Sequence, residues 1–286
     1  MIEHPLSTAA AWIAFFAQID FPVLRHSVTE LEYWHENADN TDIHKLSEVI
    51  LHDPLLTLRV LAYIESHRHQ RQTTDITTID RAIMMIGMTP FFRDFQQLPI
   101  AEEQLKSHPQ ALLGLLKTVN RACQAAQWAR QWAILRRDVD VDEIRLAALL
   151  HDLAELLMWL FAPSLALAVA QTQLAQPHQR SAHIQSAIYG VPLYRLKLEL
   201  AKAWRLPDLL VQLMDDQHAE NPRVRNVKLA VDLARHSANG WHDAALSDDF
   251  TAIRDLLHIN QETLVRHLDV DTATADALLA QDKPAT

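Results

Sequence analysis

The sequence contains very little cysteine and very little glycine. Its one cysteine, Cys123, cannot form an intramolecular disulfide, and we expect a protein of a reducing compartment. Its four glycines, Gly87, Gly114, Gly190 and Gly240, are far apart in the sequence, which excludes both common types of glycine-rich phosphate loop. Nucleotide-binding α/β folds are therefore disfavoured.

The chain also lacks an excess of basic residues and a long apolar run. Its 286 residues include 26 Lys and Arg against 36 Asp and Glu, a net charge of −10, so we expect no direct nucleic-acid partner. The most apolar stretch, residues 146–170, is interrupted by charged residues and proline, and it falls short of the about 18 uninterrupted apolar residues of a membrane span. The first residues lack the basic and apolar segments of a signal peptide. We therefore predict a cytoplasmic protein without a membrane partner.

Apolar residues recur with the 3.6-residue period of an α-helix along nearly the whole chain, and alternating strand patterns are missing. The predicted fold class is all-α. Asp53-Pro54 predicts a capped helix start, and Gly87 the end of a helix that begins near Thr77 and Asp80. We expect helices over about 54–66, 107–135 and 142–161, and two or three weaker helices between 247 and 279.

One expected helix carries polar residues in an otherwise apolar sequence. After Arg145, the polar residues of the stretch 145–160 are His151, Asp152 and Glu155, spaced to share one narrow face of a buried helix. Buried ionisable groups must bind each other, a metal or a partner backbone. Two interpretations stay open: a satisfied polar cluster in the core, or a His-Asp metal pair for Zn²⁺, Mn²⁺ or Fe that takes further ligands from other helices.

Several motifs, taken in order, resemble one bacterial family. They are Asp53-Pro54, Ile86-Gly87, His151-Asp152, Tyr189-Gly190 and Trp204-Arg205-Leu206-Pro207. Over about residues 20–238 the sequence resembles the HDOD family, the HD-related output domain. The resemblance implies a multi-helical fold of two helical subdomains, the second related to HD phosphohydrolases. It also implies bacterial signal transduction, mostly without demonstrated catalysis.

From this resemblance we predict the organisation of the chain. Residues 1–19 form an N-terminal helix, and residues 20–238 form an HDOD-like domain. That domain divides into a first helical subdomain, 20–106, and an HD-like subdomain, 107–238. Residues 239–286 form a C-terminal helical extension.

The resemblance implies a metal-ligand set that this chain keeps only in part. His151 and Asp152 match the His-Asp pair of HD enzymes, and Asp232 matches their late aspartate. Thr118 stands where the earlier histidine would be, and Leu193 where many members have another. We predict a vestigial metal site of His151, Asp152 and Asp232, able at most to hold a divalent Mn, Fe, Zn or Ni ion weakly. No catalytic residue and no other cofactor is predicted.

Two later histidines lie near this set. The family's later His-His pair is Gln217-His218 in this sequence, so Asp215, Asp216 or His218 could assist a metal. His236 lies one turn after Asp232 and could hydrogen-bond it, or the two could form an ordinary helix-surface pair.

These observations predict a bacterial signalling or regulatory protein whose degenerate HD-like domain is non-catalytic. It would act as an interaction module for a signalling protein partner, or as a sensor that binds a ligand such as a nucleotide. The alternative is a metal-dependent phosphohydrolase acting on a nucleotide or a cyclic dinucleotide, with His151, Asp152 and Asp232 as ligands.

Overall fold

The structure is a computed structural model that describes residues 1–37, 42–67, 77–176, 178–268 and 270–280. Across these ranges the regular secondary structure is helical, and β pairing is limited to two isolated bridges, Val23 with Ile100 and Ala238 with Gly240. The all-α prediction is confirmed. The chain folds into two compact units, Met1–Asn120 with Leu150–Val211 and Arg121–Leu149 with Gln212–Thr286.

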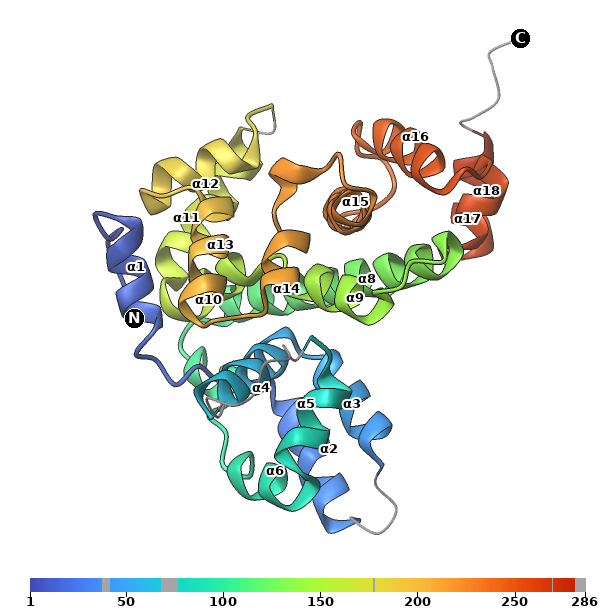
Figure 1. The fold of residues 1–286 in the computed structure, drawn as a ribbon. Helices are drawn as coiled ribbons and strands as arrows, with labels where there is room; N and C mark the ends of the chain where they lie inside the picture. Colours follow the sequence, from blue (N-terminus) through green and yellow to red (C-terminus); the bar gives the residue numbers. More distant parts are fainter. Residues whose placement is uncertain (38–41, 68–76, 177, 269, 281–286) are drawn as a thin grey trace. The chain divides into compact units, whose positions relative to one another are not determined.

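The first unit contains two groups of helices, and Figure 1 shows their order. The first group is α2 (Arg25–Glu36), α3 (Ile43–Leu51), α4 (Pro54–Ser66), α5 (Ile79–Ile86), α6 (Met88–Asp94) and α7 (Ala101–Gln104). The second is α1 (Ala9–Phe16), the first part of α8 (Pro109–Arg136), α10 (Leu153–Phe161), α11 (Pro163–Ala175), α12 (Ser181–Tyr189), α13 (Leu193–Ala203) and most of α14 (Asp208–Leu213).

The second unit contains the rest of the long helix and the C-terminal helices. Its elements are the second part of α8, α9 (Val141–Leu149), the 3₁₀ turn η2 (Asp216–His218), α15 (Pro222–His236), α16 (Leu246–Leu257), α17 (Gln261–Arg266) and α18 (Thr272–Ala280). Helix α15 packs against α9 and α16. The predicted long helix is present and runs past Gly114 without interruption, and three helices follow residue 245, as expected.

Asp53 caps the start of α4 as predicted and also binds the first turn of α2 by hydrogen bonds. Its carboxylate accepts hydrogen bonds from the backbone of Leu55 (2.8 Å) and Leu56 (3.2 Å), with Pro54 in the first turn. It also accepts from the backbone N–H of Leu24 and the hydroxyl of Ser27, both at 2.8 Å. Asp53 is fully buried, and burial raises the pKa of its carboxyl above the usual value despite these four donors.

The start of α5 differs by one residue from the prediction. Thr78, not Thr77, is the N-cap, and its hydroxyl accepts from the backbone N–H of Arg81 at 3.4 Å. Gly87 ends the helix as expected, with φ at +81°, a conformation that only glycine adopts without strain. The shift has a simple cause, because two successive threonines can each cap and the backbone selects one of them.

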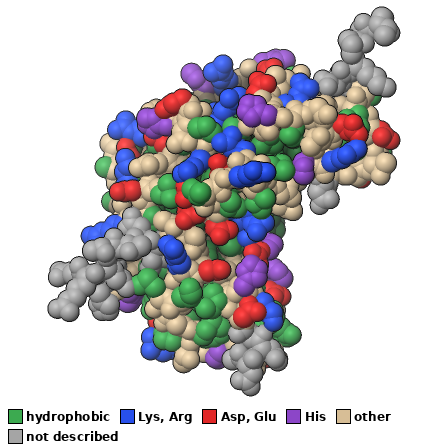
Figure 2. Space-filling view, turned by 45° about the vertical axis from the view of Figure 1, so that its right-hand side comes forward, with side chains coloured by type: hydrophobic (Ala, Val, Ile, Leu, Met, Phe, Trp, Pro, Cys, Tyr) green, Lys and Arg blue, Asp and Glu red, His purple; other side chains and the backbone are tan. Residues whose placement is uncertain are grey.

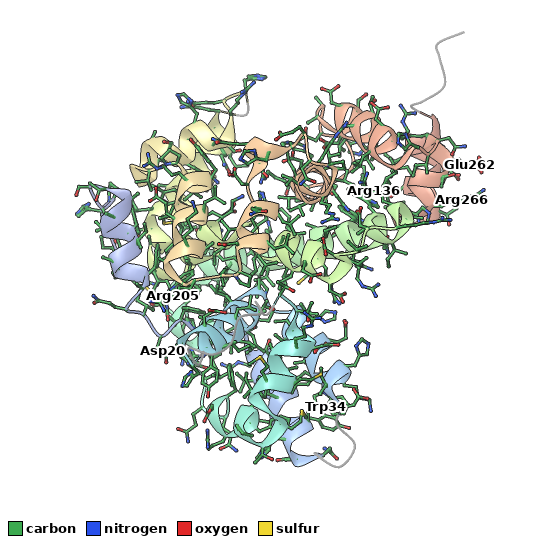
Figure 3. All side chains as sticks on the ribbon, in the orientation of Figure 1. Asp20, Trp34, Arg136, Arg205, Glu262 and Arg266 are labelled. Carbon is green, nitrogen blue, oxygen red and sulfur yellow. The ribbon has the colours of Figure 1, made fainter. Side chains whose placement is uncertain are left out.

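The Trp204-Arg205-Leu206-Pro207 motif ends α13 by a Schellman arrangement. Arg205, labelled in Figure 3, has a left-handed φ of +55° and donates its N–H to the carbonyl of Lys202 at 3.0 Å. The N–H of Leu206 donates to the carbonyl of Ala201 at 2.9 Å, the second bond of this motif. Pro207, which has no N–H, follows directly and precedes α14.

The helix expected over residues 142–161 is in fact two helices. Helix α9 ends at Leu149 and α10 begins at Leu153, with Leu150, His151 and Asp152 in a turn between them. Asp152 is the N-cap residue of α10, with φ −90° and ψ 19°. Its side chain makes no capping hydrogen bond to α10, so the break is set by the backbone of the turn. The prediction that His151, Asp152 and Glu155 share one continuous helical face is therefore wrong.

Among the described helices, none is by itself long and apolar enough to span a membrane. The pair Val141–Phe161 and Pro163–Ala175 meets the length and composition criteria only when taken together, with a bend of 115° between the two segments.

Candidate functional site

The His-Asp pair lies inside the first unit, at the break before α10. The side chains of His151 and Asp152 are 7% and 9% exposed, so both are buried. The Nδ1 atom of His151 lies 3.7 Å from Oδ1 of Asp152. This distance exceeds that of a good hydrogen bond.

A buried lysine completes the group on the other side of the imidazole. Lys197 of α13 is 3% exposed, and its Nζ lies 2.8 Å from Nε2 of His151. Helix α13 packs against α1 and α10, with Leu196 and Leu200 in the core. Lys197 was not predicted from the sequence. The available signal was its spacing, one residue after Leu196 and three before Leu200, which places it on the buried stripe.

Thr118 takes part in the same interior region, where it replaces the expected histidine. It is 2% exposed, and its hydroxyl lies 3.0 Å from the carbonyl of Gly114 and 3.2 Å from Oε1 of Glu155. Gly114 allows α8 to approach α10 closely, because a Cβ at this position would lie 2.5 Å from the ring of Trp159. The close approach brings Thr118, one turn later, next to Glu155.

Tyr189 of α12 is a buried neighbour of these groups. It is 2% exposed, and its backbone carbonyl accepts a hydrogen bond from the indole of Trp12 at 3.3 Å. Burial and, to a smaller extent, the negative charge of Glu155 raise the pKa of the Tyr189 phenol above its usual value. Tyr189 therefore stays protonated.

The third predicted ligand, Asp232, lies in the second unit, on α15. Its carboxylate is engaged by two cations of its own helix, Lys228 one turn before and Arg235 three residues after. His218 of η2 also lies in the second unit, where its side chain is 64% exposed, with Nε2 3.8 Å from Oδ2 of Asp215.

The donors around His151 do not fit a divalent metal ion. The Nε2 lone pair that would bind the metal already faces the ammonium of Lys197, and Thr118 offers a hydroxyl where HD enzymes would offer an imidazole. Within the described ranges, no group of three or more His, Cys, Asp or Glu side chains is arranged to hold a metal ion. The set of His151, Asp152 and Asp232 stays a prediction for metal analysis to test.

A second His-Asp pair, which the sequence did not indicate, joins α15 to α16. Nδ1 of His236 lies 2.6 Å from Oδ2 of Asp249, 13 residues further along the chain. The hydrogen bond with Asp249 raises the pKa of the His236 imidazole, and the charges of Asp249, Asp232 and Asp243 add to this effect. His236 ends α15 and Asp249 lies in the first turn of α16, so both helix dipoles favour the charged forms.

The end of α16 is also fastened by a charged side chain. Arg136, labelled in Figure 3, donates from Nη1 to the carbonyl of Leu256 and from Nε to Oδ2 of Asp138, both at 3.1 Å. Between these ties, Phe250 stacks on Trp241 with ring centroids 6.2 Å apart. Helix α16 is therefore held at its first and last turns by charge-assisted contacts.

The surface carries both charge signs. On the face shown in Figure 2, acidic and basic side chains are interspersed among histidines and apolar side chains. That face shows no continuous basic area of the kind that non-specific phosphate binding uses.

Solved structures show the same fold at low sequence identity. A virulence factor from Campylobacter jejuni subsp. jejuni has a TM-score of 0.69 at 18% identity and covers 99% of this chain and 100% of its own. The MmoQ response regulator from Methylococcus capsulatus str. Bath has a TM-score of 0.66 at 16% identity and covers 89% of this chain and 100% of its own. No curated protein matches the sequence.

The family assignment rests on the sequence. The HDOD domain matches residues 21–220, which include the capped start of α4, the His151-Asp152 turn and the α13 terminus described above. The motifs that suggested the resemblance are thus the residues that end, cap and separate these helices. The chain belongs to the HDOD family.

Proposed function

We propose that this protein is a bacterial signal-transduction module whose HD-related part binds a partner protein and does not hydrolyse phosphate esters. The observation that carries the proposal is that both ring nitrogens of His151 face other side chains of this protein. Its Nε2 faces Lys197 at 2.8 Å and its Nδ1 faces Asp152 at 3.7 Å. A hydrolytic HD site needs that imidazole to hold a metal and an open position for the attacking water.

The comparisons support the signalling part of the proposal. One of the proteins with the same fold is a response regulator by name, and it covers most of this chain. The proposal places the protein in the bacterial cytoplasm and keeps residues 20–238 as the HDOD-like domain, with 239–286 as its C-terminal extension.

A turnover assay tests the non-catalytic part. Purified wild-type protein and Asp152→Ala are incubated with nucleotides, cyclic dinucleotides and a generic phosphodiester, each with added Mn²⁺, Fe²⁺, Zn²⁺ or Ni²⁺. We expect both proteins to hydrolyse these substrates only at the background rate, whether the product is inorganic phosphate or, for a diester, a phosphomonoester. Turnover that needs a metal and is lost in Asp152→Ala would establish the phosphohydrolase alternative instead.

A crosslinking experiment tests the partner part. Partners are identified by crosslinking in cells and then purified, and binding to this protein is measured with and without EDTA. We expect a complex whose Kd does not change when metal is removed. Stabilisation by a nucleotide in a thermal-shift panel, with no protein complex, would identify a ligand sensor instead.

A further inference from the structure

Lys197 is an unusual residue to find in a helical core. Lysine side chains are almost never fully buried unless they are paired, because removing an ammonium from water is costly. Lys197 is 3% exposed, whereas Lys202, five residues later on the same helix, is exposed. The buried position therefore reflects a specific attraction between the ammonium and the groups around it.

The contact with His151 fixes which atom donates. A lysine ammonium has three donors and no acceptor, so Nε2 of His151 is the acceptor at 2.8 Å. The imidazole then carries its single proton on Nδ1, the nitrogen that faces Asp152. The structure thus places Nε2 of His151 against the amine of Lys197 and Nδ1 against the carboxylate of Asp152.

The same lone pair of His151 is the one that a metal would use. A neutral imidazole nitrogen has one lone pair, and it cannot serve an ammonium and a metal ion at once. The interior region also holds the carboxylates of Asp152 and Glu155, whose negative charge a divalent metal would balance in an HD enzyme. Lys197 supplies positive charge to this region from the chain itself.

We infer that the Lys197 ammonium is a cation supplied by the chain itself that occupies the Nε2 lone pair of His151 in place of a metal ion. It thereby prevents divalent ions from binding at the His151-Asp152 turn. The inference rests on the proposed non-catalytic function and extends it, because Lys197 then supplies the positive charge that a metal ion would otherwise bring to this interior region. It assigns to Lys197 a positioning role and no catalytic one.

The wild-type protein allows a direct test. Imidazole ¹⁵N chemical shifts of His151, assigned by comparison with His151→Gln, report which nitrogen carries the proton. We expect a neutral ring protonated at Nδ1, with shifts that do not change when Zn²⁺ is added, while exposed histidines respond. A ring protonated at Nε2, or a His151 signal that moves with Zn²⁺, would overturn the inference.

A matched pair of variants tests the closure. Lys197→Met removes the charge and keeps the apolar stem, and Lys202→Met makes the same change at an exposed site. We expect Lys197→Met to bind Zn²⁺ at least about tenfold more tightly than Lys202→Met, the scale of change seen when one group beside a metal ligand is altered. The gain should disappear in Lys197→Met combined with His151→Gln.

The two results separate the inference from the proposed function. A folded Lys197→Met that binds Zn²⁺ no better than Lys202→Met contradicts the role of Lys197, and it leaves the turnover and partner results of the wild type unaffected. Lys197→Arg keeps the charge and should behave as wild type. If Lys197→Met does not fold, the ¹⁵N measurement on the wild type still decides.

Discussion

Two of the His-Asp pairs in the described residues, His151 with Asp152 in the first unit and His236 with Asp249 in the second, are built in opposite ways. His151 and Asp152 are neighbours in sequence and buried, yet their nearest atoms are 3.7 Å apart. His236 and Asp249 are 13 residues apart, with side chains 27% and 11% exposed and a 2.6 Å contact between Nδ1 and Oδ2. Adjacency in sequence marks a motif, whereas tertiary packing decides which pair forms a strong hydrogen bond.

The second difference between the pairs is the source of positive charge. In the first unit the cation is the ammonium of Lys197, which faces Nε2 of His151. In the second unit the imidazole is itself the group that can carry the positive charge, because the hydrogen bond with Asp249 raises the pKa of His236. Substitutions at the first pair should therefore change the stability through the burial of these side chains. The effect of substitutions at the second pair should depend on pH.

The largest effect is expected from breaking the first pair. His151→Leu removes the acceptor that lies 2.8 Å from Nζ of the buried Lys197 and should lower the free energy of unfolding by about 3 kcal/mol or more, because losing a hydrogen bond costs more at a charged donor. Lys197→Met removes the donor that faces the buried Nε2 of His151 and should cost about 1–3 kcal/mol. Urea denaturation followed by circular dichroism measures both.

The double variant then tests whether the two side chains act as a unit. We expect the combined cost of His151→Leu and Lys197→Met to be smaller than the sum of the single costs by about 0.5–3 kcal/mol. Additive costs would show that the 2.8 Å contact contributes nothing specific.

A smaller effect is expected at the second pair. Asp249→Asn keeps the shape of the side chain and removes the charge-assisted hydrogen bond to His236, which should cost about 1–2 kcal/mol. Hydrogen exchange locates the loss: amides of α16 should exchange faster, while amides of α10 and α13 serve as the internal control. Equal acceleration in both units would argue against a local role.

The pH dependence of the second pair follows from the direction of its pKa shift. Folding raises the pKa of His236 above its ordinary value of 6.5, so the folded state binds the proton more tightly than the unfolded chain does. The stabilisation is fully present below about pH 6.5 and is lost as the pH rises through the folded-state pKa.

The measurement is the difference in unfolding free energy between wild type and His236→Gln across a series of pH values. We expect the difference to be largest at the acidic end of the series and to shrink at alkaline pH. A difference that grows with pH would contradict the raised pKa.

The sequence predicted the local parts of this fold and not its long-range contacts. Asp53-Pro54 and Gly87 act on backbone groups within a few residues, so their caps could be read directly. The break at His151 was missed, because the apolar residues around it favour one continuous helix in any local analysis. Lys197 was missed because its acceptor is 46 residues away.

The candidate site shows the same limit. His151 and Asp152 were found as a motif, but the atoms that decide their chemistry come from α13, and a helical pattern does not specify which helix lies opposite. His236 was considered with Asp232, one turn away, whereas its acceptor is Asp249 on the next helix. A period of 3.6 residues gives the neighbours on one helix and leaves its packing partners open.

The smallest effect is expected at Asp232, the late aspartate of the predicted metal set. Asp232→Asn removes its ion pairs with Lys228 and Arg235, whose side chains are 39% and 38% exposed, and surface pairs within one helix contribute little. We expect a loss below about 0.5 kcal/mol in urea denaturation and unchanged metal content by elemental analysis. If instead about one metal ion per chain is found in the wild type and is lost in Asp232→Asn, then Asp232 is a metal ligand. The inference that Lys197 takes the place of a metal ion would then be wrong.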